Sequence, residues 1–156
     1  MAATPTVPEM FRVITLDRYF MWCRFQRDHY KEIKVTWETD FFDSMEMQHA
    51  FMCLSYWYAG LYVVCEGWQE LKLSDSEIDK LLASPYLDVL RRYRNGVFHF
   101  QQDYFDKRLK EAIKLGQDFQ CWVEELMSNF QRYFRHWWQK HQLVIPQMKA
   151  KSTAVN

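Results

Sequence analysis

Arginine and histidine, two residue types that together can cleave a phosphodiester, stand close together in the segment 91–100, which reads RRYRNGVFHF. An arginine guanidinium can hold two phosphate oxygens at once, and a histidine titrates near neutral pH and can move protons. Three of the first four residues are arginines, which adds local positive charge. We therefore take Arg94, Asn95 and His99 as candidate catalytic residues, with Arg91 in support, and expect no metal ion and no cofactor.

Helix geometry sets a condition on this site. Residues five positions apart on an ideal helix point about 140° away from each other. Arg94 and His99 can therefore converge only if the helix breaks between them. Gly96 lies at that place, and we expect it to end the helix. The alternative is an ordinary helix end with a solvated arginine and a packed histidine.

A carboxylate in an apolar run is a further candidate. Glu66 lies in the stretch VVCEGW, between residues that a helix would bury. An unpaired buried carboxylate is costly, so it needs a cation or a hydrogen-bond donor nearby. We predict that Glu66 lies within ionic reach of Arg94 or Arg91 and supports the arginine. The alternative is that Glu66 lies at a helix end in water.

The segment 46–49 has the E-x-x-H spacing of a di-iron helical bundle. Such a site needs two of these motifs and two further glutamates on facing helices. This chain has only one copy, because the other histidines have no glutamate three residues before them. A solvated helix face is the better interpretation of Glu46 and His49.

Basic and aromatic residues alternate between positions 132 and 141. Such a mixture can hold phosphates and stack on bases. A helix with an apolar stripe and a charged outer face has the same composition, and we favour that interpretation.

Apolar residues recur at steps of three and four along most of the chain, which is typical of amphipathic helices. We expect an all-α, up-and-down bundle of four long helices with one or two short ones, forming a single domain over residues 1–156. An irregular arm is expected over about residues 1–10 and a loose tail over about residues 146–156. Helices are predicted near residues 16–33, 51–68, 74–82, 85–95, 106–115 and 119–137. The third should start at Ser74, which has the S-x-x-E spacing of a capping box with Glu77, and Gly116 should end the fifth.

Composition agrees with a well-packed core. Nearly half of the residues (49%) are hydrophobic, including 12 Phe, 7 Trp and 9 Tyr. The 20 basic residues balance the 20 acidic ones, so the whole chain has no strong preference for nucleic acid or anionic membranes. The four cysteines stand apart among apolar residues, which indicates core thiols in a reducing cytoplasm.

The longest uncharged run covers residues 50–65. It is shorter than the ~20 apolar residues that a membrane span needs, so we expect a buried helix and no membrane association. This helix is apolar on all sides, which predicts that it is covered on all sides, either in the centre of a bundle or at a subunit interface. The chain opens without a basic and then apolar leader, which favours a cytoplasmic protein.

The segment around Arg94, Asn95 and His99 resembles the HEPN superfamily. These small helical bundles carry an arginine, four to six further residues and then a histidine, and a polar residue often follows the arginine. The likeness in architecture covers roughly residues 10–142, and Glu66 lies on an earlier buried helix. Two features depart from the family: Gln101 stands where some toxin members have a tyrosine, and the chain has no nucleotidyltransferase partner domain.

The resemblance implies a dimer whose two motifs face each other across a shared cleft. Active members are metal-independent endoribonucleases, in which the RNA 2′-hydroxyl attacks the adjacent phosphate. By this likeness His99 is the general base or acid, Arg94 stabilises the phosphorane, and Asn95 orients one of them. Many members are toxins or defence proteins with an antitoxin partner, and others only bind.

Three functions therefore stay open. The first is an endoribonuclease of the HEPN type that acts on RNA. The second is a non-catalytic dimeric module that binds a protein, a nucleotide or RNA through the same cleft. The third is a plain helical scaffold in which Arg94 and His99 only cap and pack.

We predict that the protein is a homodimer. An apolar second helix and a high aromatic content leave more apolar surface than one small bundle covers. Light scattering at micromolar concentration should give twice the mass of the 19.2 kDa chain. A monomeric mass would contradict both the dimer and the shared cleft.

Overall fold

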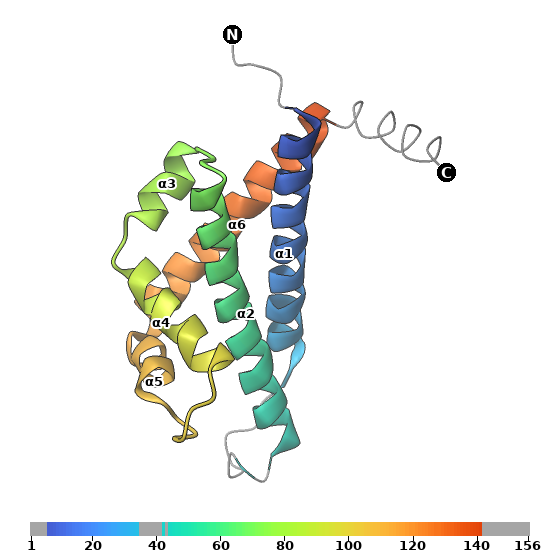
Figure 1. The fold of residues 1–156 in the computed structure, drawn as a ribbon. Helices are drawn as coiled ribbons and strands as arrows, with labels where there is room; N and C mark the ends of the chain where they lie inside the picture. The colour runs from blue at the N-terminus through green and yellow to red at the C-terminus, as the bar shows by residue number, and fades with distance from the viewer. Residues whose placement is uncertain (1–5, 35–41, 43, 142–156) are drawn as a thin grey trace.

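The computed structural model describes residues 6–34, 42 and 44–141, and this part of the chain contains six helices and no strand (Figure 1). The prediction of an all-α bundle is therefore confirmed. Three helices have 26 residues each, one has 13, and two are short. The helices are α1 (Val7–Glu32), α2 (Met45–Glu70), α3 (Ser76–Leu82), α4 (Tyr86–Phe98), α5 (Lys107–Lys114) and α6 (Gly116–His141).

The helix α2 lies in the middle of the arrangement (Figure 1). The helix α1 runs antiparallel along one side of it, and α3, α4 and α5 lie on the other side. The helix α6 crosses diagonally behind α2 and ends at the end of the molecule where α1 begins. The candidate segment thus lies on α4, away from α1.

Aromatic side chains from α1, α2 and α6 fill the centre of the bundle. Phe20 and Phe130 lie with their ring centroids 5.9 Å apart, and Trp68 contacts Phe130 edge to face at 5.5 Å. These three side chains are almost completely buried. Burying one such ring contributes roughly 1.5–3 kcal/mol, so this contact joins the three longest helices.

The prediction that the rest of its own bundle covers α2 on all sides is wrong, whereas its burial at a subunit interface stays a prediction. Within one chain, α2 has one buried face and one exposed face. Its inner face is buried, but Met45, Met52 and Tyr56 are 73%, 45% and 46% exposed on its outer face. The reason is that α1 and α4 flank α2 and leave part of its circumference free. No helix in the described residues is both long and apolar enough to cross a membrane, including this one with its uncharged run 50–65.

The first helix begins earlier than predicted. It starts at Val7, and the Thr6 backbone N–H donates to the Glu9 carboxylate at 2.7 Å, which satisfies one of the free donors of the first turn. Residues 7–10 are therefore helical, and not part of an irregular arm. Residues 1–5 and the expected tail at 146–156 lie outside the described residues.

The short helix α3 is capped by Asp75 rather than by the predicted Ser74. The Asp75 carboxylate accepts hydrogen bonds from the backbone N–H groups of Glu77 and Ile78. Ser74 instead donates its hydroxyl to Asp79 at 2.9 Å. A carboxylate is as good a cap as a hydroxyl, so the helix begins one residue later than the capping-box spacing suggests.

Three of the four cysteines are buried as predicted, and Cys121 is not. Cys23, Cys53 and Cys65 lie in the core, and burial raises the pKa of each thiol. Cys121 lies on the exposed side of α6, because it precedes the buried Trp122 by one residue and so points about 100° away from it.

Gly116 separates α5 from α6, as the sequence predicts. Its φ angle is +60°, and a Cβ atom placed on it would meet no other atom within 4 Å. The backbone angle alone therefore disfavours a side chain. Replacing Gly116 with alanine should lower the free energy of unfolding by about 1 kcal/mol.

Gly60 provides the matched control, because a Cβ atom there would make only ordinary contact with Cys23 at 3.6 Å. Gly60→Ala should leave stability unchanged or raise it by up to about 1 kcal/mol, since alanine favours a helix interior. Urea denaturation of both variants checks the opposite signs. Equal effects at both positions would contradict the account of Gly116.

Candidate functional site

The buried face of α4 determines where the candidate residues lie. Tyr93 is fully buried, packs edge to face on Tyr58 of α2 at 5.4 Å, and has its hydroxyl 3.3 Å from the Ser55 hydroxyl. Burial raises the pKa of Tyr93 to about 12, so the phenol stays protonated. This contact fixes the rotation of α4 on α2. Arg94, the next residue, is thereby placed at the edge of the α2–α4 interface.

Arg94 is held by Glu66, as the sequence predicts. Its Nη2 donates to both carboxylate oxygens of Glu66, at 3.0 and 3.2 Å. Its Nη1 donates to the side-chain oxygen of Asn95 at 3.0 Å. The side chains of Arg94 and Glu66 remain 26% and 41% exposed, so the pair lies at the surface of the interface and a ligand can reach it.

Tyr62 also contacts Arg94, and the sequence analysis missed it. The Arg94 guanidinium lies over the Tyr62 ring, 5.1 Å from its centroid. Burial raises the pKa of Tyr62, the Glu66 charge raises it further, and Arg94 lowers it. The signal was present in the sequence, because Tyr62 precedes Glu66 by four residues and so lies on the same side of the helix.

The break expected at Gly96 does not occur, because α4 continues to Phe98. Gly96 is buried, and a Cβ atom there would lie 3.2 Å from a methyl group of Leu109. The glycine therefore permits close packing of α5 on α4 and does not end the helix.

The helix ends instead at His99. Its backbone is extended (φ −113°, ψ 132°), and its N–H donates to the carbonyl of Asn95 at 3.2 Å. The His99 side chain is exposed. Both Arg94 and His99 belong to the described part of the chain, and no hydrogen bond or ring contact joins their side chains. The structure thus brings together Arg94, Asn95 and Glu66, and it leaves His99 apart from them.

The other two arginines of the segment have their own carboxylates. Arg91 donates to Asp88 at 2.6 Å, so it does not share Glu66 with Arg94. Arg92 pairs with Asp88 as well as with Glu111. The hydrogen bond from Arg92 lowers the pKa of Glu111. Nearby carboxylates therefore balance the positive charge that the sequence concentrates here.

The E-x-x-H segment forms a solvated helix face, as we favoured. Glu46 and His49 are both exposed in the first turns of α2. Within the described ranges, no group of three or more His, Cys, Asp or Glu side chains is placed to hold a metal ion.

The basic and aromatic residues of 132–141 belong to an amphipathic helix, also as favoured. Phe134 and Trp137 are buried, and Arg132 lies on the exposed side, where it pairs with Asp75 at 2.6 Å. This hydrogen bond lowers the pKa of Asp75. Arg135 and Trp138 of the same helix line a groove against α1.

Comparison of the chain with protein-family models, with curated proteins and with solved structures finds no match in any of the three. The HEPN resemblance therefore rests on the residues of the segment 91–100 and on the helical architecture. It stays a prediction.

The Glu66–Arg94 pair should orient the arginine more than it stabilises the fold. Because both side chains reach solvent, their coupling should be no more than about 1 kcal/mol. A double-mutant cycle of Glu66→Gln and Arg94→Gln, followed by urea denaturation, measures this coupling. A coupling of several kcal/mol would mean that the pair is structural.

Proposed function

We propose that the chain is a metal-independent endoribonuclease of the HEPN type that acts as a homodimer. The observation that carries the proposal is the arrangement of Arg94, whose guanidinium is held by Glu66, Asn95 and Tyr62 at the surface of the α2–α4 interface. A guanidinium fixed in this way is ready to bind a phosphate without a further loss of side-chain freedom. A toxin or defence role with an antitoxin partner belongs to the same proposal.

Arg94 keeps donors for a substrate. A guanidinium has five N–H groups, and Arg94 makes three hydrogen bonds to described residues, two of them from Nη2 and one from Nη1. The Nε–H and one Nη1–H therefore remain, and because they lie on different edges of the guanidinium, each can donate to a separate acceptor. Asn95 and Glu66 keep the arginine in place, since each accepts a hydrogen bond from it.

The proposed reaction needs two proton transfers, one from the attacking 2′-hydroxyl and one to the departing 5′-oxygen. A histidine removes the proton of the 2′-hydroxyl, and the oxygen attacks the adjacent phosphorus. The bond to the 5′-oxygen breaks, and that oxygen takes up a proton. The products are a cyclic phosphate and a free 5′-hydroxyl. His99 performs one or both proton transfers, and Arg94 stabilises the charge of the phosphorane.

A second copy of the chain can bring a histidine to Arg94 although α4 does not break between Arg94 and His99. Arg94 and His99 make no side-chain hydrogen bond or ring contact with each other in the described part of the chain, so His99 of one subunit would act with the partner's Arg94 across the shared cleft. Exposed apolar side chains near the helix end support an interface here. Tyr56 packs on Phe98, and these two residues and Phe100 are 46%, 52% and 95% exposed. Surfaces of this kind commonly mark contact sites.

The second candidate function is a non-catalytic dimeric module that binds a protein, a nucleotide or RNA. The carboxylate partners of Arg91, Arg92 and Arg94 favour it, because they reduce the field that would attract an RNA backbone. Both functions use the same surface, and only the endoribonuclease would cleave RNA.

The test is cleavage of RNA by the purified protein with EDTA present. The wild-type protein should cut RNA and leave cyclic phosphate ends. His99→Ala should lower the rate by about 10²–10⁴-fold, since the acid–base group is lost. Arg94→Lys should be strongly impaired as well, because lysine keeps the charge but not the two-pronged geometry. If expression of the wild-type protein inhibits the growth of the host cells, expression of these two variants should inhibit it less.

The control is His136→Ala, which removes an exposed histidine of α6 and should leave cleavage unchanged. Circular dichroism and light scattering should show that all variants fold and assemble alike. A wild-type protein that never cuts RNA, with a His99→Ala variant that behaves identically, would overturn the proposal and favour the binding module.

A further inference from the structure

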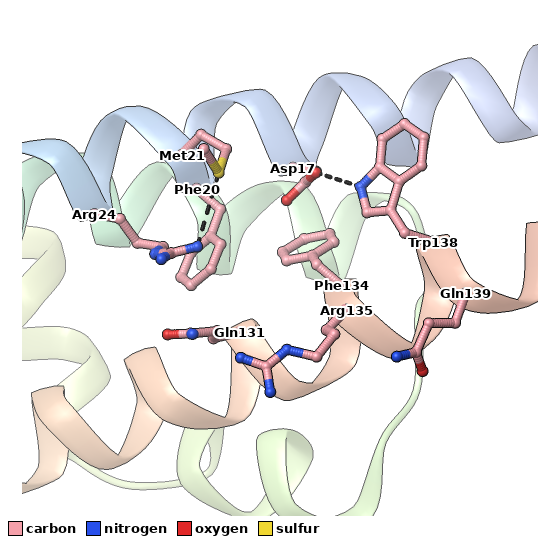
Figure 2. A pocket seen from close by; sticks show the side chains of 9 residues that line it. All are labelled: Asp17, Phe20, Met21, Arg24, Gln131, Phe134, Arg135, Trp138 and Gln139. Atoms are coloured by element: carbon pink, nitrogen blue, oxygen red, sulfur yellow. Dashed lines mark hydrogen bonds between the residues drawn. The ribbon is translucent and has the colours of Figure 1, made fainter. Parts of the chain in front are cut away.

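A groove of about 580 Å³ lies between α1 and α6 and shares no residue with the Arg94 site (Figure 2). Phe20, Phe134 and Trp138 give it apolar walls, and Arg24, Arg135 and two glutamines give it polar groups. Its size falls in the range of small-molecule sites, which are mostly apolar with a few placed polar groups. The question is which ligand these groups fit.

Arg24 lacks the partner that a buried donor needs. Its Nε is buried and has no hydrogen-bond partner among the described residues. Its Nη1 has only a long contact of 3.8 Å with the sulfur of Met21, which is a weak acceptor. Buried N–H groups are nearly always paired, so the Arg24 guanidinium is only weakly satisfied within the described residues. The charge of Arg24 makes an anion the suitable acceptor.

Arg135 adds a second positive charge. It projects from α6 toward the end of the groove where Arg24 and Gln131 lie (Figure 2). Neither arginine forms an ion pair within the described residues, unlike the three arginines of α4. Two such guanidinium groups and one amide suit a doubly charged phosphate better than a singly charged group.

Asp17 does not fill the role of the missing anion. One of its oxygens accepts a hydrogen bond from the Trp138 indole at 2.6 Å (Figure 2). Burial raises the pKa of Asp17, while Trp138 and Arg24 lower it. Its carboxylate would repel a phosphate placed beside it, so the phosphate belongs at the other end of the groove.

We propose that this groove binds a phosphate monoester that carries an aromatic or other apolar group. The phosphate lies between Arg24 and Arg135, and the apolar part lies along Phe134 and Trp138 toward Asp17. The proposal is independent of the ribonuclease proposal, because it depends on other residues and another pair of helices.

The test is a titration of the full chain with phenyl phosphate, followed by calorimetry and by the NMR signal of the Trp138 indole N–H, assigned with Trp138→Phe. Phenyl phosphate should bind saturably and shift this signal. Inorganic phosphate should bind at least about tenfold more weakly, since it lacks the apolar part. Benzyl alcohol, which lacks the charge, should not bind measurably.

Charge-removing variants locate the site. Arg24→Gln and Arg135→Gln should each weaken the binding of phenyl phosphate by about tenfold or more, because each loses a charged hydrogen bond. Arg18→Gln is the matched control: it lies on α1, outside the groove, and should bind as the wild type does. Asp17→Asn should bind phenyl phosphate at least as tightly as the wild type.

Three results would overturn the proposal. The first is no saturable binding of phenyl phosphate up to about 10 mM. The second is unchanged binding by Arg135→Gln, which is exposed and so tests the site even if Arg24→Gln fails to fold. The third is that both variants weaken binding of an RNA oligonucleotide while phenyl phosphate does not bind, which would make the groove an RNA surface.

Discussion

Burial of the inner face of α2 is the constraint on which the rest of the structure depends. Leu61, Val64 and Cys65 have no exposed surface, and Trp57 and Trp68 are as deeply buried. Apolar burial is the main favourable term in folding, so this face requires neighbours along the whole helix. The helix α1 covers one flank and α4 the other. The contacts of Arg94 with Glu66 and Tyr62 follow from that second packing.

The position of α4 converts an ordinary surface carboxylate into a partner for an arginine. Rotation of α4 by one residue would bury Arg94 or turn it away from α2. Tyr93 prevents both, because its fully buried ring and its hydroxyl contact with α2 specify a single rotation. Glu66 and Tyr62, one turn apart on α2, then both contact the Arg94 guanidinium. The arginine is positioned by core packing, and its own ion pair only orients its end.

The arginines of α4 and those of the groove between α1 and α6 have different environments. Those of α4 have carboxylate partners, and their charges are nearly balanced within the chain. Arg24 and Arg135 have none among the described residues, and they share a groove with apolar walls. Carboxylate partners hold the arginines of α4 in defined orientations, as a reactive or binding residue requires. The positive charges of Arg24 and Arg135 are not compensated by a carboxylate ion pair among the described residues, so they can attract an anion. Composition reports a net charge of zero and does not distinguish the two.

The helical class, most of the helices and many of the core residues could be predicted from the amino-acid sequence, because three-to-four spacing of apolar residues is a local property. The pairing of Glu66 with Arg94 was also predicted, although Glu66 is partly exposed and not buried as that prediction assumed. The packing of Gly96 against Leu109, and with it the continuation of α4 to Phe98, became visible only once the helices were seen together. The tertiary structure alone also revealed the exposed outer face of α2, the carboxylates beside Arg91 and Arg92, and the unpaired Arg24. Each of these depends on which helix lies opposite, and residues distant in sequence meet only after the helices pack.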